Sequence, residues 1–159
     1  MDAGQEGVRH RVVQVRPLDW TRVALFAVPA LAWAGVLFWL SAQSGETIKD
    51  AEAQRFDIPG LGYFAHGALY FVLGGLAWLW ARAGLGVSPG RGLIVAVVFA
   101  VLYGVSDEWH QSFVPGRSPD ALDVVADGFG ALAAAVALWG AGRTRASRVK
   151  SPSGDEDAG

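Results

Sequence analysis

The sequence predicts an all-α protein, an integral membrane four-helix bundle with both termini in the cytoplasm. Two observations support this fold class: long uncharged apolar segments, and an uneven distribution of Lys and Arg between the segments that connect them. Of the 159 residues, 52% are hydrophobic and only 18% are charged, whereas about 25% are charged in an ordinary soluble domain. The chain has no cysteine, which excludes disulfides and thiolate metal sites.

The first two spans are predicted over residues 22–40 and 62–81. A helix needs roughly 20 apolar residues to cross a bilayer, and neither Asp, Glu nor Lys occurs in these two segments. The first segment could instead be a cleaved signal peptide, because Ala42-Gln43-Ser44 offers a tolerable cleavage site. Its uncharged run is longer than the roughly 7–15 residues of a signal-peptide core, so we expect it to be retained.

The third and fourth spans must include charged residues. The uncharged stretches 93–106 and 128–142 are too short alone to cross the bilayer. The third span therefore ends, and the fourth begins, with ionisable side chains in its terminal turns: Asp107, Glu108, His110, Asp123 and Asp127. A ridge of small residues on the fourth span, Ala126, Gly130 and Ala134, is suited to close helix packing.

The distribution of Lys and Arg predicts the orientation. Ten of these residues lie at the termini and in the second connection, and three lie on the opposite side. The ten are Arg9, Arg11, Arg16, Arg22, Arg82, Arg91, Arg143, Arg145, Arg148 and Lys150, and the three are Lys49, Arg55 and Arg117. Because basic residues accumulate on the cytoplasmic side, we expect both termini and the second connection to be cytoplasmic. The chain then divides into a cytoplasmic N-terminal segment (1–21), a four-helix domain in the cell membrane (22–142) and a disordered cytoplasmic tail (143–159).

This topology places nearly all the ionisable groups of the spans at one depth, in the outer leaflet. The second span enters there, the third ends there and the fourth begins there. Ionisable groups within a span cost roughly 2.5–3.5 kcal/mol each on insertion scales, so they face the bundle interior and pair. The candidate binding cluster consists of His66, Tyr70, Asp107, Glu108, His110, Gln111, Arg117, Asp123 and Asp127.

Three arrangements could satisfy the charges of this cluster: salt bridges, a divalent cation, or a phosphate received by Arg117 and the imidazoles. Candidate metal ligands are Asp107, His110 and Asp127. Ordinary structural roles remain open for several members. Asp120 or Asp123 could cap the fourth helix, Glu108 and His110 could face headgroup water, and Tyr70 could serve packing alone.

The second half of the cluster carries a distinctive pattern. Residues 107–117 read Asp-Glu-Trp-His-Gln-Ser-Phe-Val-Pro-Gly-Arg, and residues 123–130 read Asp-Val-Val-Ala-Asp-Gly-Phe-Gly. This pattern resembles the signature of the VanZ-like family. Leu40-Ser41-Ala42-Gln43-Ser44, and His66 with Tyr70, are similar to its earlier elements, so the resemblance covers about residues 22–142.

Two positions depart from the family pattern. Asp127 stands where the family usually has Asn, and Tyr63 stands where it usually has Lys. The cluster thereby gains a negative charge and loses a positive one. A cationic partner, either a metal or an arginine, becomes more necessary in this chain.

The resemblance implies a cell-envelope protein without an agreed reaction or agreed catalytic residues. The family's namesake is associated with low-level resistance to the glycopeptide antibiotic teicoplanin. We therefore expect the outer cluster to bind the headgroup of a membrane lipid or of a lipid-linked cell-wall precursor, which could lower susceptibility to teicoplanin-type antibiotics. We expect no nucleic-acid partner.

The main alternative is an enzyme, a membrane-embedded metal- or carboxylate-assisted hydrolase or transferase that acts on a lipid headgroup. An Asp/Glu/His cluster at a membrane interface suits such chemistry, but the sequence has no H-E-x-x-H motif and no serine nucleophile elbow. Transport is a weaker alternative, because the chain has neither an inverted repeat nor a polar residue at mid-membrane depth. A purely structural role is the remaining alternative.

Overall fold

The computed structural model describes residues 17–47 and 60–150, and its regular secondary structure there is entirely helical. Four helices in this part of the chain are long and apolar enough to cross a membrane. They are α1 (Trp20–Ser41), α3 (Leu61–Leu79) continued by the π-helical turn η1 (Trp80–Gly84), α4 (Pro89–Gln111) and α5 (Ala121–Lys150). The prediction of an all-α fold is confirmed, and four helices of the described residues have the length and apolar composition expected of the predicted spans.

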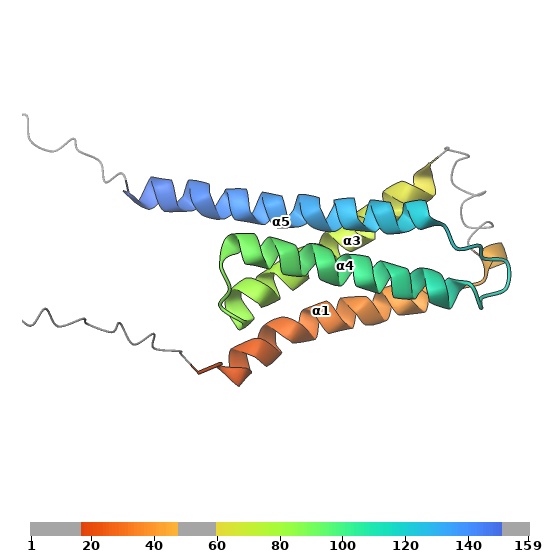
Figure 1. Ribbon diagram of the computed structural model, residues 1–159, viewed down its shortest axis with the longest axis horizontal. Coiled ribbons are helices and arrows are strands. Elements are labelled where there is room, and N and C mark those ends of the chain that lie inside the picture. Colours follow the sequence, from red (N-terminus) through yellow and green to blue (C-terminus); the bar gives the residue numbers. More distant parts are fainter. Residues whose placement is uncertain (1–16, 48–59, 151–159) are drawn as a thin grey trace, which may run out of the picture.

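The helix α3 crosses behind α4 in the view of Figure 1. It packs against α1, α4 and α5, whereas α1 and α5 make no contact with each other in the described residues. Because α3 and α5 begin where α1 and α4 end, one end of the bundle gathers the C-terminal turns of α1 and α4 and the N-terminal turns of α3 and α5. We call this the cluster end.

Local signals explain where the helices begin. The Asp19 side chain caps α1 by accepting hydrogen bonds from the backbone N–H groups of Thr21 and Arg22, at 3.1 and 3.2 Å. The helix therefore starts at Trp20, two residues before the expected Arg22. Pro89 occupies the first turn of α4, where its missing N–H would have had no helical partner.

The helix α5 is longer than expected. It continues to Lys150, so residues 143–150 are helical where a disordered tail was predicted from 143 onward. This segment contains Arg, Ala and Lys, which favour helix, and it has neither Gly nor Pro after Gly142. Basic side chains also interact favourably with the C-terminal end of a helix. Residues 151–159 of the predicted tail lie outside the described part of the chain.

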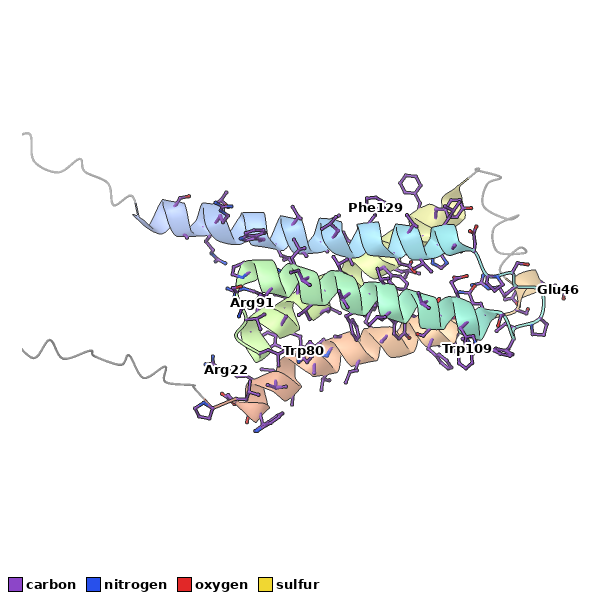
Figure 2. All side chains as sticks on the ribbon, viewed as in Figure 1. Arg22, Glu46, Trp80, Arg91, Trp109 and Phe129 are labelled. Atoms are coloured by element: carbon purple, nitrogen blue, oxygen red, sulfur yellow. The ribbon has the colours of Figure 1, made fainter. Side chains whose placement is uncertain are left out.

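Small residues bring α3 and α5 into backbone contact. A Cβ atom at Gly130 would collide with the backbone of Gly67, and one at Gly74 would collide with Ala131. Ala131 and Ala134 are fully buried. The small-residue ridge expected on the fourth span therefore lies in the α3–α5 interface, while large apolar side chains such as Phe129 point outward (Figure 2).

Candidate functional site

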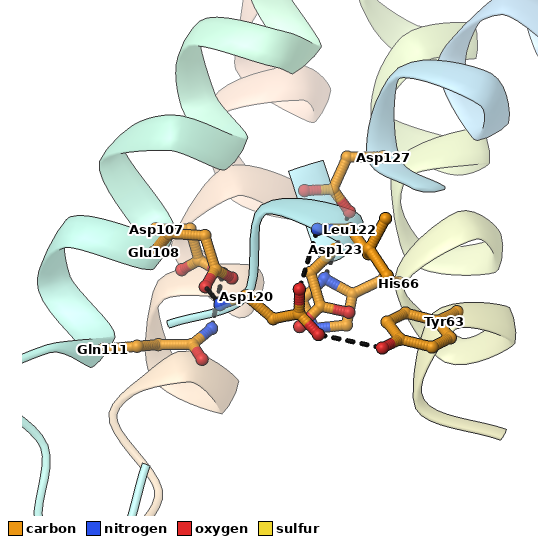
Figure 3. Close-up of polar contacts among 9 residues, drawn as sticks. All are labelled: Tyr63, His66, Asp107, Glu108, Gln111, Asp120, Leu122, Asp123 and Asp127. Carbon is orange, nitrogen blue, oxygen red and sulfur yellow. Dashed lines mark hydrogen bonds and ion pairs between the residues drawn. The ribbon is translucent and has the colours of Figure 1, made fainter. Parts of the chain in front are cut away.

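His66 links α3 to α5 at the cluster end (Figure 3). Its Nδ1 atom lies 3.1 Å from Asp127 Oδ1, and its Nε2 atom lies 3.7 Å from Asp123 Oδ2. Asp123 and Asp127 are one turn apart on α5 and therefore share a helix face. The imidazole of His66 thus lies between two carboxylates, as the topology led us to expect for His66 and Asp127.

Asp127 is completely buried against α4. A Cβ atom at Gly104 would lie 2.5 Å from Asp127 Oδ2, so the glycine leaves the space that the carboxylate occupies. That Oδ2 atom has no hydrogen-bond partner among the described residues. Gly104 is not among the residues predicted for the site, although it precedes Asp107 by three residues and so lies on the same face of the helix.

The last turns of α4 contribute two more buried carboxylates. Asp107 Oδ2 accepts a hydrogen bond from Gln111 Nε2 at 3.0 Å, and Glu108 Oε2 accepts one from the Asp120 backbone N–H at 2.6 Å. Asp107 and Glu108 are each 7% exposed, and Oδ1 of the first and Oε1 of the second are buried without a hydrogen-bond partner in the described structure. Glu108 therefore ties the end of α4 to the start of α5 and keeps one oxygen free.

Asp120 caps α5, one of the structural roles considered from the sequence. Its Oδ1 atom accepts from the Leu122 N–H at 2.9 Å, and its Oδ2 atom accepts from the Tyr63 hydroxyl at 2.8 Å. These hydrogen bonds, the one from Leu122 above all, hold the pKa of Asp120 below its usual value. Tyr63, at the position where the family usually has Lys, thus joins α3 to the start of α5 through a hydrogen bond from its uncharged hydroxyl to the Asp120 carboxylate.

His110 contacts α1, whereas we expected it to lie with Asp107 and Asp127 as a candidate metal ligand. Its ring packs on Phe38 with a centroid distance of 4.5 Å, and its Nδ1 atom lies 3.2 Å from Ser41 Oγ. It therefore contacts α1. The predicted metal ligands Asp107, His110 and Asp127 do not form a common group within the described residues. The side chains that do are His66, Glu108 and Asp123, each offering one ligand atom within 4.8 Å of the others.

Tyr70 lies beneath the imidazole of His66, one turn further along α3. The two rings are stacked, with centroids 6.4 Å apart and an interplanar angle of 10°. Tyr70 is 1% exposed, and its hydroxyl has no hydrogen-bond partner in the described part of the chain.

The loop that carries Arg117 is held against the end of α1. The Gly45 N–H donates to the Pro115 carbonyl at 3.1 Å, and the backbones of Gly45 and Gly116 touch. Gly116 has a φ of 77°, which glycine adopts without strain. This contact brings residues 40–44 and residues 112–117 together in space, although they are far apart in the sequence.

A cavity of about 230 Å³ adjoins the cluster. Its lining includes the apolar side chains of Leu37, Leu40 and Leu69. It also includes the polar side chains of His66, Arg117 and Asp123. Arg117 is half-buried, and no carboxylate of the described residues lies within 4.0 Å of its guanidinium. Arg117 therefore forms no salt bridge with a carboxylate of the described residues, although such a pair was one of the predicted arrangements.

Comparison with known proteins identifies the family. The sequence profile of the VanZ/LLP1 family matches residues 26–142, which is most of the chain and includes the whole cluster. No curated protein matches the chain significantly, and no solved structure does so either. The chain belongs to the VanZ/LLP1 family.

Proposed function

We propose that the cluster end lies in the outer leaflet of the cell membrane and binds the phosphorylated headgroup of a lipid or of a lipid-linked cell-wall precursor. The observation that carries this proposal is the mixed cavity, whose lining includes three leucines and the half-buried Arg117. A guanidinium that is not engaged by a carboxylate can bind two phosphate oxygens at once. The leucines would contact the first carbons of the attached lipid chain.

The distribution of basic residues favours an outer-leaflet site. Arg22 and Arg91 lie at the end of the bundle opposite Glu46 and Trp109 (Figure 2), and basic residues favour the cytoplasmic side. In the cell envelope, a protein that binds such a headgroup would reduce the access of a teicoplanin-type antibiotic to its target. Expression of the wild type, and not of Arg117→Gln, is then expected to raise the concentration of teicoplanin that stops growth.

Cysteine labelling tests the orientation. The chain has no cysteine, so Glu46→Cys and Ser151→Cys are clean single-site variants. A membrane-impermeant maleimide added to intact cells is expected to label Glu46→Cys, and to label Ser151→Cys only after the cells are opened. Labelling of Ser151→Cys in intact cells would refute the proposed topology.

Lipid retention tests the binding proposal. We expect Arg117→Gln to lower retention of phosphatidylglycerol or of a polyprenyl diphosphate by roughly 10- to 100-fold, because hydrogen bonds to charged groups contribute about 1.5–3 kcal/mol. Native mass spectrometry of protein released from nanodiscs measures the bound lipid, and the two probes distinguish a phospholipid from a cell-wall precursor.

The control for lipid retention is Arg91→Gln. Arg91 is exposed at the other end of α4, so this variant removes the same charge and is expected to retain lipid as the wild type does. Equal retention by all three proteins would contradict a headgroup site at Arg117.

The alternative function is a hydrolase or transferase that acts on the same headgroup. It is favoured by the convergence of His66, Glu108 and Asp123 beside the cavity, because an imidazole and carboxylates can transfer protons or hold a metal ion. Incubation of the two lipid probes with purified protein, followed by mass spectrometry of the lipid, distinguishes the functions. Binding leaves the lipid unchanged, whereas catalysis releases or transfers part of its headgroup.

A further inference from the structure

We propose that His66, Glu108 and Asp123 bind a divalent cation of the zinc or manganese class. We propose further that this cation and Arg117 together contact the headgroup phosphate, a step that rests on the function proposed above. The three ligands come from three helices, α3, α4 and α5, so the site exists only when the cluster end is assembled.

The distances suit one shared ion. A nitrogen or oxygen atom from each of the three side chains lies within 4.8 Å of the other two, and Figure 3 shows His66 and Asp123 side by side. Ligand atoms bound tetrahedrally to one zinc ion at 2.0–2.2 Å lie about 3.3–3.6 Å apart. The most widely separated ligand atoms therefore need to approach each other by up to about 1.5 Å, which rotation of Glu108 and Asp123 can supply.

Glu108 supplies independent evidence for a ligand. It is only 7% exposed, and its Oε1 atom is buried with no hydrogen-bond partner among the described residues. A buried polar atom without a partner costs roughly 1–3 kcal/mol, so such an atom in a native protein calls for an explanation. A bond from Glu108 Oε1 to a cation would give this atom the partner that it lacks.

The orientation of His66 also fits a metal ligand. Its Nδ1 atom is engaged by the buried carboxylate of Asp127 at 3.1 Å, while Nε2 lies 3.7 Å from Asp123 Oδ2. Metal-binding histidines usually donate the hydrogen of the second nitrogen to a carboxylate or carbonyl, which fixes the ring. Asp127 is therefore a positioning residue that turns Nε2 toward Glu108 and Asp123.

The charge of the cluster explains why an anionic headgroup needs a cation. Four carboxylates, those of Asp107, Glu108, Asp123 and Asp127, gather with His66 at the cluster end (Figure 3), while Arg117 lines the adjoining cavity. A divalent cation cancels two of these negative charges and offers the phosphate a ligand position. Three protein ligands leave at least one position open, on the side where His66 and Asp123 line the cavity.

The donor atoms select the class of metal. One imidazole nitrogen with carboxylate oxygens suits zinc or manganese. Calcium prefers six to eight oxygen ligands, roughly twice what this site provides.

Metal titration tests the site. The full chain in detergent, freed of metal with a chelator, is titrated with Zn²⁺ and Mn²⁺, and the bound metal is counted by mass spectrometry. We expect one ion per chain in the wild type. Glu108→Gln and Asp123→Asn are expected to weaken binding by at least about 100-fold, because even outer partners of metal ligands contribute 10- to 100-fold.

The matched control is Asp120→Asn. It removes a carboxylate that lies next to the site but is not one of the three ligands, and asparagine caps a helix as well as aspartate does. We expect this variant to bind metal with wild-type affinity. Circular dichroism and thermal melting of each variant separate loss of the ligand from loss of the fold.

The outcomes distinguish this inference from the proposed function. Absence of stoichiometric metal from the folded wild type would overturn the metal site, and so would equal affinity in the ligand variants and in Asp120→Asn. Retention of phosphatidylglycerol or polyprenyl diphosphate to the same extent with and without metal would overturn the bridging step and leave the proposed function standing. Metal binding without lipid retention in either state would support the metal site and refute the headgroup function.

Discussion

Replacing Gly130 with leucine is expected to lower the free energy of unfolding by about 3 kcal/mol or more, the upper part of the range for overpacking. A Cβ atom at this position would collide with the Gly67 carbonyl and lie 3.0 Å from the Phe71 nitrogen, both of which belong to the α3 backbone. A backbone cannot rotate away as a side chain can. We expect α3 and α5 to separate, which would also pull His66 away from Asp127.

Unfolding of the purified protein in a denaturing detergent, followed by circular dichroism, measures this effect. The matched control is Gly140→Leu on the same helix. Gly140 is exposed, and a Cβ atom there would meet nothing within 4 Å. The control is therefore expected to unfold as the wild type does, and equal stability of the two variants would contradict the close packing of α3 on α5.

The four spans could be predicted because the membrane imposes a minimum length on apolar segments. At 1.5 Å per residue, the 22 residues of α1 measure about 33 Å, close to the thickness of the hydrocarbon core. The end of α5 could not be predicted in this way, because the span-length criterion does not apply to residues beyond the membrane. The helix preferences of the individual residues from 143 to 150 decide there, whereas the polar character of the tail favoured a prediction of disorder.

The position of the site at one end of the bundle could also be predicted, since helix direction alone places His66, Asp107 and Asp127 there. The contacts between helices could not. The Asp107–Gln111 hydrogen bond joins residues four apart on α4, which share a helix face, but the contact of His110 with Ser41 on α1 depends on how the two helices are rotated. The role of Gly104 depends on the position of a carboxylate on another helix, which no local pattern encodes.

Replacing His66 with alanine is expected to lower the free energy of unfolding by about 3–5 kcal/mol, the usual cost of removing one partner from a buried pair. The cost comes from the Asp127 carboxylate, which is 0% exposed and accepts its hydrogen bond from His66 Nδ1. Without the imidazole, the carboxylate is buried beside Asp107 and Asp123 with no donor. Abundance in the membrane and detergent unfolding measure the effect.

Combining His66→Ala with Asp127→Asn is expected to restore most of the lost stability, because the amide removes the uncompensated charge. Asp127→Asn alone should be tolerated, since its amide oxygen still accepts from His66 Nδ1 and the family usually has Asn at this position. In the double variant, binding of metal and lipid should stay lost, because Nε2 of His66 is absent. If the double variant recovers binding along with stability, His66 is a structural residue and not a ligand. If it recovers neither, the His66–Asp127 contact is not what stabilises this end of the bundle.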